Sequence, residues 1–284
     1  MSKLKISVLV PAFNEEQAIR LTVENLRQTL ATLPVEAEIL VIDDGSTDGT
    51  AEQARLAGVT VLRHPHNIGY GRALKTGLER AAGDWIVIVD ADGTYPTEAL
   101  PSLLREIPAF DMVVGARGGP CYHGSVAKRL GRWSLKAMVH FVCGISVPDV
   151  NSGFRVFRRD IGLRHMANIS NGFSFTTTLT LIMLLEGHFV HYVPIDYRER
   201  AGKSKVRFRR DILRTMQILV QAILQYNPIK LFLLFATTPA WIAPPALLLD
   251  FFLAQGVHSG IIVALLASAS LVIFALGLVI SGLK

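Results

Sequence analysis

The segment that decides the fold is Ile86-Val87-Ile88-Val89-Asp90-Ala91-Asp92, in which four apolar residues lead directly into two aspartates. Such a run is typical of a strand buried on both faces of a parallel sheet. The aspartates then fall at the carboxyl end of that strand, where open α/β sheets hold their ligands. Two carboxylates one residue apart suit a divalent cation that also contacts substrate phosphates. The alternative is a solvated turn that happens to contain two aspartates.

Further apolar runs alternate with helical patterns on either side of this segment. We expect strands at residues 6–10, 39–43, 59–63, 85–90 and 112–115. We expect helices at residues 15–32, 47–57, 69–82 and 97–107. This alternation predicts an α/β domain with a mostly parallel sheet that is covered by helices on both faces.

Polar motifs follow the first two expected strands. The first is Pro11-Ala12-Phe13-Asn14-Glu15-Glu16, and the second is Asp43-Asp44-Gly45-Ser46-Thr47-Asp48. Asn14 and Ser46 could be helix N-caps, but capping does not account for the paired aspartates. Acidic residues at this sheet edge commonly accept hydrogen bonds from a ribose or a base, which points to a nucleotide.

A glycine-containing motif opens the third expected helix at residues 67–77. It misses the phosphate-binding loop of NTPases, because Leu74 stands where the second glycine is required. Gly69 and Gly71 would instead let the backbone pass close to a nucleotide at the start of a helix.

The last part of the chain has the composition of a membrane anchor. Residues 231–249 and 261–280 contain no charged side chain, and each run is close to the ~20 residues that span a bilayer. Pro239, Pro244 and Pro245 should kink or unwind the first span. Nine lysines and arginines lie in residues 198–230 and none in 250–260, so the soluble part should face the cytosol.

Residues 208–226 show an apolar stripe opposite a basic and amide face, which predicts an amphipathic helix in the membrane interface. The net charge of +6 comes mainly from the juxtamembrane residues 198–230, so anionic headgroups or a phosphorylated substrate suit the protein better than nucleic acid. Cys121 and Cys143 match no metal or redox spacing and should be reduced thiols. Residues 1–5 lead straight into a strand, so no signal peptide is expected.

Taken together, these motifs resemble family 2 inverting glycosyltransferases of the GT-A fold. Gly115-Ala116-Arg117, Asn151-Ser152-Gly153-Phe154-Arg155 and Arg200-x-Gly202-Lys203-Ser204-Lys205 are similar to the polyprenyl-phosphate branch, which includes dolichyl-phosphate mannosyltransferases and polyprenyl-phosphate glucosyltransferases. The resemblance implies a Rossmann-like GT-A domain at residues 1–207, a juxtamembrane amphipathic helix at 208–228 and a two-helix transmembrane anchor at 229–284.

The resemblance also implies roles for individual residues. Asp90 and Asp92 would hold Mg²⁺ or Mn²⁺, with Asp92 favoured as the direct ligand, and Arg117 would meet phosphate. The expected nucleotide-sugar contacts are Pro11, Ala12, Asn14, Glu15, Asp43, Asp44, Gly71, Ala91 and Arg117. The expected contacts to the acceptor phosphate are Arg129, Arg200, Lys203, Ser204 and Lys205.

The expected reaction is transfer of one hexose from a UDP- or GDP-sugar to a polyprenyl phosphate at the cytosolic membrane face, with inversion. Such a phosphate has a second pKa near ~6, so it is largely a dianion at neutral pH and needs no general base. An alcohol acceptor would need one, and Asp149 is the candidate. The alternatives are therefore a family 2 transferase that uses an alcohol acceptor, and a catalytically silent nucleotide-sugar binder at the membrane. The residues do not choose glucose or mannose, nor dolichol or undecaprenol.

Overall fold

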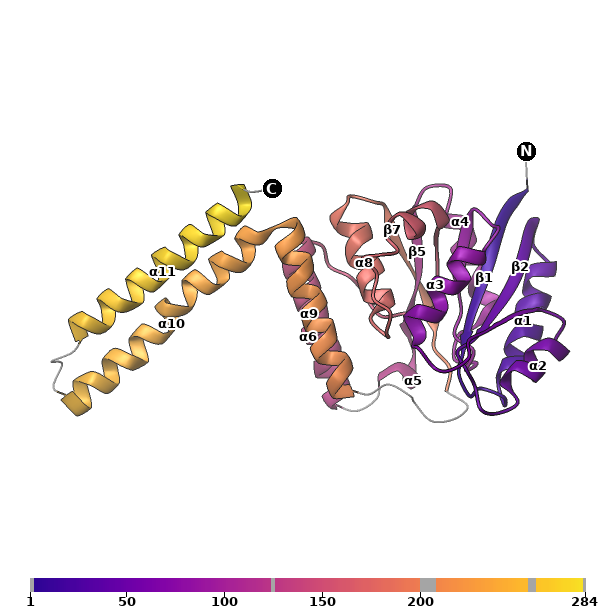
Figure 1. Ribbon diagram of the computed structural model, residues 1–284, viewed down its shortest axis with the longest axis horizontal. Helices are drawn as coiled ribbons and strands as arrows, with labels where there is room; N and C mark the ends of the chain where they lie inside the picture. The colour runs from indigo at the N-terminus through magenta and orange to yellow at the C-terminus, as the bar shows by residue number, and fades with distance from the viewer. Residues whose placement is uncertain (1–2, 124–125, 200–207, 255–258, 283–284) are drawn as a thin grey trace. The chain divides into compact units, whose positions relative to one another are not determined.

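The computed structural model divides the chain into two compact units, residues 1–215 and 216–284. The structure describes residues 3–123, 126–199, 208–254 and 259–282. The first unit holds a seven-stranded sheet, and the second is helical (Figure 1). The domain boundaries expected from the sequence, at residues 207 and 228, stay predictions.

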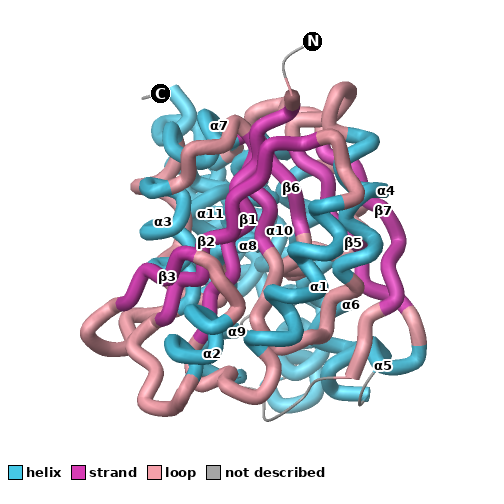
Figure 2. Tube along the Cα trace, turned by 90° about the vertical axis from the view of Figure 1, so that its right-hand side faces the viewer, coloured by secondary structure: helices cyan, strands magenta, loops and turns pink. Residues whose placement is uncertain are grey.

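The sheet is mostly parallel, as expected. Its strands are β1 (Leu4–Ala12), β2 (Val35–Asp43), β3 (Thr60–Arg63), β4 (Trp85–Ile88), β5 (Met112–Gly118), β6 (Arg155–Arg158) and β7 (Val190–Asp196). Their order across the sheet is β3-β2-β1-β4-β6-β5-β7, with β3 and β7 at the two edges (Figure 2). β6 runs antiparallel to both β4 and β5, whereas all the other neighbouring strands are parallel. All five strands expected from the sequence are present; β6 and β7 were not anticipated.

Helices cover both faces of the sheet, because alternate residues of each strand point to opposite sides. Val8 and Val10 of β1 face one apolar cluster, and Leu9 faces the other. The first cluster includes α1 (Ile19–Ala31), α2 (Thr50–Leu56) and α4 (Leu100–Glu106), which follows the short 3-10 turn η1 (Thr97–Ala99). The second includes α3 (Tyr70–Arg80), α7 (Arg159–Arg164) and α8 (Phe175–Leu185). Two helices, α5 (Pro120–His123) and α6 (Val126–Cys143), lie between β5 and β6 in the chain.

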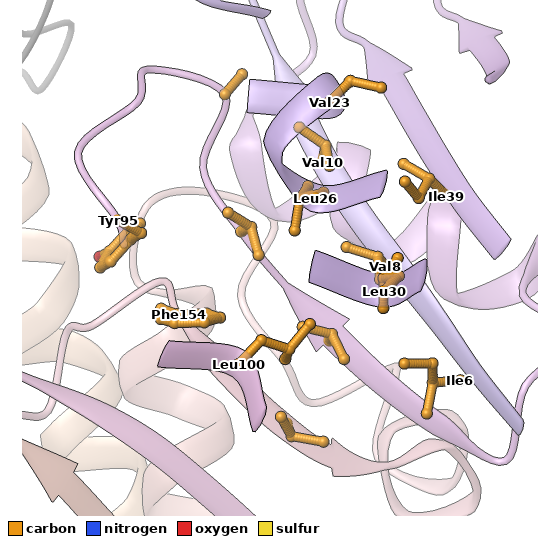
Figure 3. Packing of buried hydrophobic residues seen from close by; sticks show 14 of the residues in the cluster. Ile6, Val8, Val10, Val23, Leu26, Leu30, Ile39, Tyr95, Leu100 and Phe154 are labelled. Atoms are coloured by element: carbon orange, nitrogen blue, oxygen red, sulfur yellow. The ribbon is translucent and has the colours of Figure 1, made fainter. Parts of the chain in front are cut away.

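The first cluster reaches from the middle of the sheet to the carboxyl ends of its strands. Figure 3 shows Val8 and Val10 against Leu26 and Leu30 of α1, with Tyr95 and Phe154 further along. The rings of Tyr95 and Phe154 lie 5.7 Å apart. Apolar packing therefore continues directly beneath the loops that follow the strands.

Polar bonds close the opposite, amino-terminal edge of the sheet. The Ser7 hydroxyl donates to Glu38 at 2.5 Å and accepts from the Gly83 N–H at 2.8 Å. Glu38 also accepts from the Ala82 N–H at 2.7 Å. These contacts join β1, β2 and the turn before β4, and a Cβ at Gly83 would lie 2.6 Å from the backbone of Ile6.

The first expected helix begins later than its sequence pattern suggests. Residues 14–18 form a turn in which Glu15 C=O accepts from Ala18 and Ile19, and α1 starts only at Ile19. Asn14 has a positive φ of 52°, a conformation that a helix cannot contain. The chain crosses to the loop after β2 before it turns into α1, and the apolar periodicity of residues 15–32 cannot reveal that detour.

The second unit contains the expected apolar helices. α9 (Phe208–Tyr226) precedes α10 (Pro228–Ala254) and α11 (Ser259–Gly282). α10 stays helical through its three internal prolines, so of the two expected effects the unwinding does not occur, and the kink stays a prediction. Gly277 of α11 lies against Phe232 of α10, where a Cβ would meet the phenylalanine side chain at 2.4 Å. A small residue thus lets the two helices approach closely.

One helix among the described residues, at Gly260–Val279, is by itself long and apolar enough to cross a membrane. Met216–Tyr226 and Pro228–Pro245 meet the same criterion only when they are taken together, and they are bent by 112°. The second expected span is therefore present as such a helix. The first expected span, at residues 231–249, stays a prediction.

Gly83→Ala should destabilise the first unit by about 1–3 kcal/mol, because the added methyl would force the backbone of β1 to move. Gly131→Ala is the matched control, since that glycine lies within α6 and an added methyl group would meet nothing within 4 Å. There the gain in helix propensity should stabilise by up to about 1 kcal/mol. Urea unfolding of the detergent-solubilised protein measures both changes. Equal stability of Gly83→Ala and the wild type would contradict the tight packing at this edge.

Candidate active site

The loops after β1 and β2 are joined to each other. The Asn14 N–H donates to the Ser46 hydroxyl at 2.9 Å, and the Asn14 side-chain oxygen accepts from the Thr47 N–H at 2.9 Å. Asp44 N–H donates to Ala12 C=O at 2.8 Å. Neither Asn14 nor Ser46 caps a helix, because α1 starts at Ile19 and α2 at Thr50. The two sequence motifs therefore form one continuous surface at the carboxyl ends of the strands.

Asp43 and Asp44 are both buried at this surface, with 0% and 3% exposure. Asp43 accepts from the Ser46 N–H at 2.9 Å, and its other oxygen lies 3.1 Å from Arg63 Nε. Asp44 lies 2.8 Å from His64 Nδ1 and accepts from the Gly69 N–H at 2.8 Å. Asp44 thus shapes the loop between β3 and α3. Its expected contact with a nucleotide stays a prediction.

The backbone of Gly71 passes close to another backbone segment of the protein. A Cβ at this position would lie 2.3 Å from the Ser170 carbonyl oxygen, and the neighbouring Arg72 N–H donates to Asn171 C=O at 3.0 Å. The start of α3 therefore packs on the loop before α8. This contact accounts for the glycine, and a further role beside a nucleotide stays a prediction.

The Asp90 carboxylate lies between two parts of the chain that are distant in sequence. It accepts from the Tyr70 hydroxyl at 2.9 Å, and a Cβ at Gly153 would lie only 2.7 Å from one of its oxygens. The Tyr70 ring stacks on Phe173 at 5.6 Å. Burial and then the charge of Asp90 raise the pKa of Tyr70, so its hydroxyl keeps the proton that it donates.

Asp92 lies at the same strand end and is 7% exposed. One of its oxygens accepts from the Thr94 N–H at 3.2 Å and from the Thr94 hydroxyl at 2.7 Å. Ala91, between the two aspartates, is buried, and its carbonyl accepts from the Thr22 hydroxyl at 3.3 Å. The loop after β4 is therefore fixed on both sides of its carboxylates.

This pair of carboxylates fits a divalent cation that is also bound by its substrate. Carboxylate oxygens are the donors that Mg²⁺ prefers, and Mg²⁺ is usually held by one or two of them together with phosphates. No cluster of three or more acidic, histidine or cysteine side chains suited to a metal occurs among the residues that the structure describes. Asp90 and Asp92 would be the protein ligands, and phosphate oxygens would supply further ones.

Arg117 and Asp149 form a buried ion pair beside this loop. Arg117 donates through Nε at 2.8 Å and through Nη2 at 3.0 Å, and its backbone N–H donates to the same carboxylate at 3.2 Å. The side chains are 16% and 4% exposed. Burial would raise the pKa of Asp149, but the hydrogen bonds and charge of Arg117 outweigh it and lower that pKa. Asp149 is therefore ionised, and its carboxylate is bound by Arg117.

Arg155 is fully buried beneath the loop that carries Asp149. It donates to the carbonyl oxygens of Ser152 at 2.5 and 3.0 Å, Val150 at 3.3 Å and Thr176 at 3.0 Å. It also donates to the Thr180 hydroxyl at 3.0 Å. Burial lowers its pKa. One side chain thus joins the loop after Asp149 to the start of α8.

Sequence reasoning missed the aromatic residues of the site. Arg117 lies over the rings of Tyr122 and Tyr197, at 5.1 and 5.5 Å. The Tyr95 hydroxyl accepts from the Gly153 N–H at 2.7 Å. Tyr70 and Tyr95 stood within or next to the quoted motifs, which was the available signal. Tyr197, at the end of β7, lies in no motif.

The expected acceptor residues are only partly described. Arg129 lies on α6 and is exposed, and none of the described residues forms an ion pair with it. Arg200, Lys203, Ser204 and Lys205 lie outside the described residues. Cys143, at the end of α6, is a half-buried thiol, as expected.

The family model for glycosyl transferase family 2 matches residues 7–162, which contain the strand-end motifs and both carboxylates. The chain belongs to glycosyl transferase family 2. Asp90, Asp92 and the loops after β1 and β2 all lie within the matched residues.

Two relatives match most of both chains. An undecaprenyl-phosphate mannosyltransferase from Micrococcus luteus is 32% identical over 219 residues, which are 72% of this chain and 88% of the relative. A dolichyl-phosphate hexose transferase from Haloferax volcanii is 31% identical over 206 residues, with 71% and 86% covered. A bactoprenol glucosyl transferase of Shigella phage SfV is 32% identical over 165 residues, with 56% and 53% covered.

The fold is similar to that of an enzyme whose structure has been solved in several complexes. Glucosyl-3-phosphoglycerate synthase from Mycobacterium tuberculosis, crystallised with Mn²⁺, UDP-glucose and phosphoglyceric acid, superposes with a TM-score of 0.64 at 21% identity. The match covers 77% of this chain and 79% of that chain. The likeness supports the GT-A fold that the motifs predicted.

Arg117→Gln should reverse the effect of pH on stability. In the wild type the lowered pKa of Asp149 gives stability above about pH 4, which is lost as the pH falls through that pKa. Without the guanidinium, burial should outweigh the backbone N–H donors of residues 117 and 151 that remain, and the pKa of Asp149 should rise. The variant should then lose stability as the pH increases from about 4 to 7. The loss at pH 7 should reach about 3–5 kcal/mol.

Arg158→Gln is the control. Both side chains of the ion pair between Arg158 and Asp160 are exposed, so this pair should contribute less than about 1 kcal/mol to the free energy of unfolding. Unfolding in urea at a series of pH values measures all three proteins. A parallel pH dependence of Arg117→Gln and the wild type would show that Asp149 does not depend on Arg117.

Proposed function

We propose that the protein transfers one hexose from a nucleoside diphosphate sugar to a polyprenyl phosphate at the cytosolic face of a membrane, with inversion. The named functions of the relatives that match most of both chains support the acceptor class. The donor is a UDP- or GDP-sugar, and the sugar is glucose or mannose. The nucleotide-sugar contacts remain those expected from the sequence, along the joined loops after β1 and β2.

The observation that carries the acceptor class is the state of Asp149. An alcohol acceptor would need a carboxylate base to remove its proton. Asp149 has a lowered pKa and accepts two hydrogen bonds from one guanidinium, so it is a poor base. Asp90 and Asp92 are the proposed metal ligands. A lipid phosphate is already largely ionised at neutral pH and suits a site without a base.

Charge stabilisation then accounts for the chemistry. Departure of the nucleoside diphosphate places negative charge on its phosphate oxygens, and a bound divalent cation would stabilise that charge. Tyr70 and Thr94 hold the Asp90 and Asp92 carboxylates in place before substrate arrives. A fixed orientation lowers the cost of reorganisation when the charge develops. The intact pair argues against a catalytically silent nucleotide-sugar binder.

The membrane contributes the acceptor. Gly260–Val279 supplies one helix of sufficient length, and the cations of residues 198–230 favour the cytosolic side for the first unit. Residues 231–249 form the second proposed span, which makes the protein multi-pass. Arg129, Arg200, Lys203, Ser204 and Lys205 are the proposed ligands of the lipid phosphate, because cations at membrane depth attract a dianionic headgroup.

Removal of the cation should stop turnover. EDTA should abolish activity, and Mg²⁺ or Mn²⁺ should restore it. Asp92→Asn should lower kcat by about 100-fold or more, since stabilisation of the leaving charge is lost. Asp84→Asn is the matched control, because Asp84 is exposed at the amino-terminal edge of the sheet. Near-UV circular dichroism checks that both variants are folded. Full activity of Asp92→Asn in chelator would refute the metal role.

The acceptor class is tested with two lipids that differ only in the headgroup. A polyprenyl phosphate should be glycosylated, and the corresponding polyprenol should not. Arg129→Ala should raise KM for the lipid phosphate by about 10-fold, the equivalent of one charge-assisted contact of about 1.4 kcal/mol, with nucleotide-sugar binding unchanged in calorimetry. Arg105→Ala, an exposed arginine on α4, is the control. Glycosylation of the polyprenol at a comparable rate would favour the alcohol acceptor.

A further inference from the structure

A cavity of about 650 Å³ lies at the amino-terminal edge of the sheet, near the starts of β4, β5 and β7. It is lined by residues 84–85, by residues 107–111, by residues 158–160 with Leu163, and by Phe189. The candidate active site lies beyond the carboxyl ends of these strands and shares no residue with the cavity. Pockets that bind small molecules have volumes of about 300–1,000 Å³, so the cavity is large enough for such a ligand.

Three aromatic side chains, Trp85, Phe110 and Phe189, contribute to the cavity wall. Phe189 is 68% exposed, which is unusual for so large an apolar side chain. The Phe110 ring stacks on His191, with 4.7 Å between the ring centres, and is thereby held in one orientation. Trp85 is half-buried at the start of β4. Aromatic walls provide most of the contact area in small-molecule sites, so the cavity suits a ligand that contains a ring.

Two carboxylates of the cavity already have cationic side chains beside them. Arg158 lies 3.5 Å from Asp111 and 3.0 Å from Asp160. Asp111 also lies 3.6 Å from His188 Nδ1, and Asp160 lies 3.6 Å from Arg164. Arg158 is therefore shared between two carboxylates of the protein and is not available to an anionic ligand.

Arg159, in contrast, has no such partner within the described parts of the chain. Its backbone N–H donates to Asp84 C=O at 2.9 Å, which fixes the start of α7 beside β4. Its side chain forms no ion pair or hydrogen bond with any residue that the structure describes, and its buried Nε lacks an acceptor. A buried donor without an acceptor is unfavourable. The guanidinium of Arg159 is therefore available to an anion that enters the cavity.

The other charges of the lining favour an anion with a single negative charge. The carboxylates of Asp84, Asp111 and Asp160 would repel a polyanion such as a nucleoside diphosphate. A carboxylate carries one charge, and its two oxygens match the planar guanidinium, which can donate two hydrogen bonds at once. The aromatic wall and the available guanidinium together therefore fit an aromatic carboxylate.

We propose that this cavity is a binding site for a small aromatic carboxylate, with Arg159 at the carboxylate and Phe110 and Phe189 against the ring. The proposal goes beyond the proposed function and does not depend on it, because none of the lining residues belongs to the candidate active site. A ligand in the cavity leaves the carboxyl ends of the strands accessible. The protein should therefore bind this ligand and a nucleotide at the same time.

Fluorine NMR of the full-length, detergent-solubilised protein tests the site, with 4-fluorophenylacetate as the probe. The wild type should bind the probe saturably, with a Kd of about 1 mM or lower. Arg159→Leu should weaken binding by about 10-fold, because the charge-assisted contact is lost. Phe189→Ala should also weaken it, and this exposed position keeps the test valid if Arg159→Leu does not fold. Arg55→Leu is the matched control, because Arg55 is an exposed arginine on α2.

Two further probes and a competition test the chemical class and the location. The neutral 4-fluorophenylacetamide and the dianionic 4-fluorophenyl phosphate should each bind about 10-fold more weakly than the carboxylate. UDP or GDP with Mg²⁺ should leave binding of the carboxylate unchanged. Uptake that does not saturate and equals that of empty micelles would overturn the proposal. Equal binding of the amide, tighter binding of the phosphate, displacement by the nucleotide, or wild-type affinity in folded Arg159→Leu or Phe189→Ala would overturn it as well.

Discussion

Beyond their first residues, the central strands β1 and β4 expose no side chain to water, and this constraint determines the rest of the first unit. Val8 and Val10 of β1 and Val87 and Ile88 of β4 are fully buried, so both faces of the sheet must be covered by helices. The polar side chains that can meet a ligand therefore lie at the strand ends and in the loops that follow them. Because β1, β2 and β4 run parallel, their carboxyl ends bring Asn14, Asp44 and Asp90 to one edge.

The carboxylates gathered there would repel one another if they were left without donors. Asp44 is bound by backbone N–H groups, Asp90 by a tyrosine hydroxyl, Asp92 by a threonine and Asp149 by an arginine. Each is thus held in one orientation by a different kind of donor. Asp149 is paired with a cation on the protein, whereas the hydrogen bonds described above for Asp90 and Asp92 come from neutral hydroxyls, which suits the metal role proposed for that pair.

The sequence predicted the strands that contain uninterrupted apolar residues, and the motifs that follow them, because burial and strand ends leave a direct pattern. β6 was missed because arginines stand at both of its ends, and Arg155 would ordinarily be placed at the surface. In α8 three threonines follow the first residue, and such a β-branched run is more typical of a strand than of a helix. The aromatic residues over which Arg117 lies come from α5 and from the residue just after β7, and pairings between segments so far apart in the sequence leave no local signal. The late start of α1 was missed for the same reason, because the bonds between the loops after β1 and β2 join segments that are far apart in the sequence.

The buried guanidinium of Arg155 restricts how this protein can vary. Its acceptors are main-chain carbonyls and one hydroxyl from the loop after Asp149 and from α8, all of which need a planar, many-armed donor. A lysine at this position would leave several of these oxygens without a partner, and an apolar residue would leave all of them so. One buried side chain therefore ties this loop to α8. A substitution of Arg155 would therefore require a compensating change in the backbone that surrounds it.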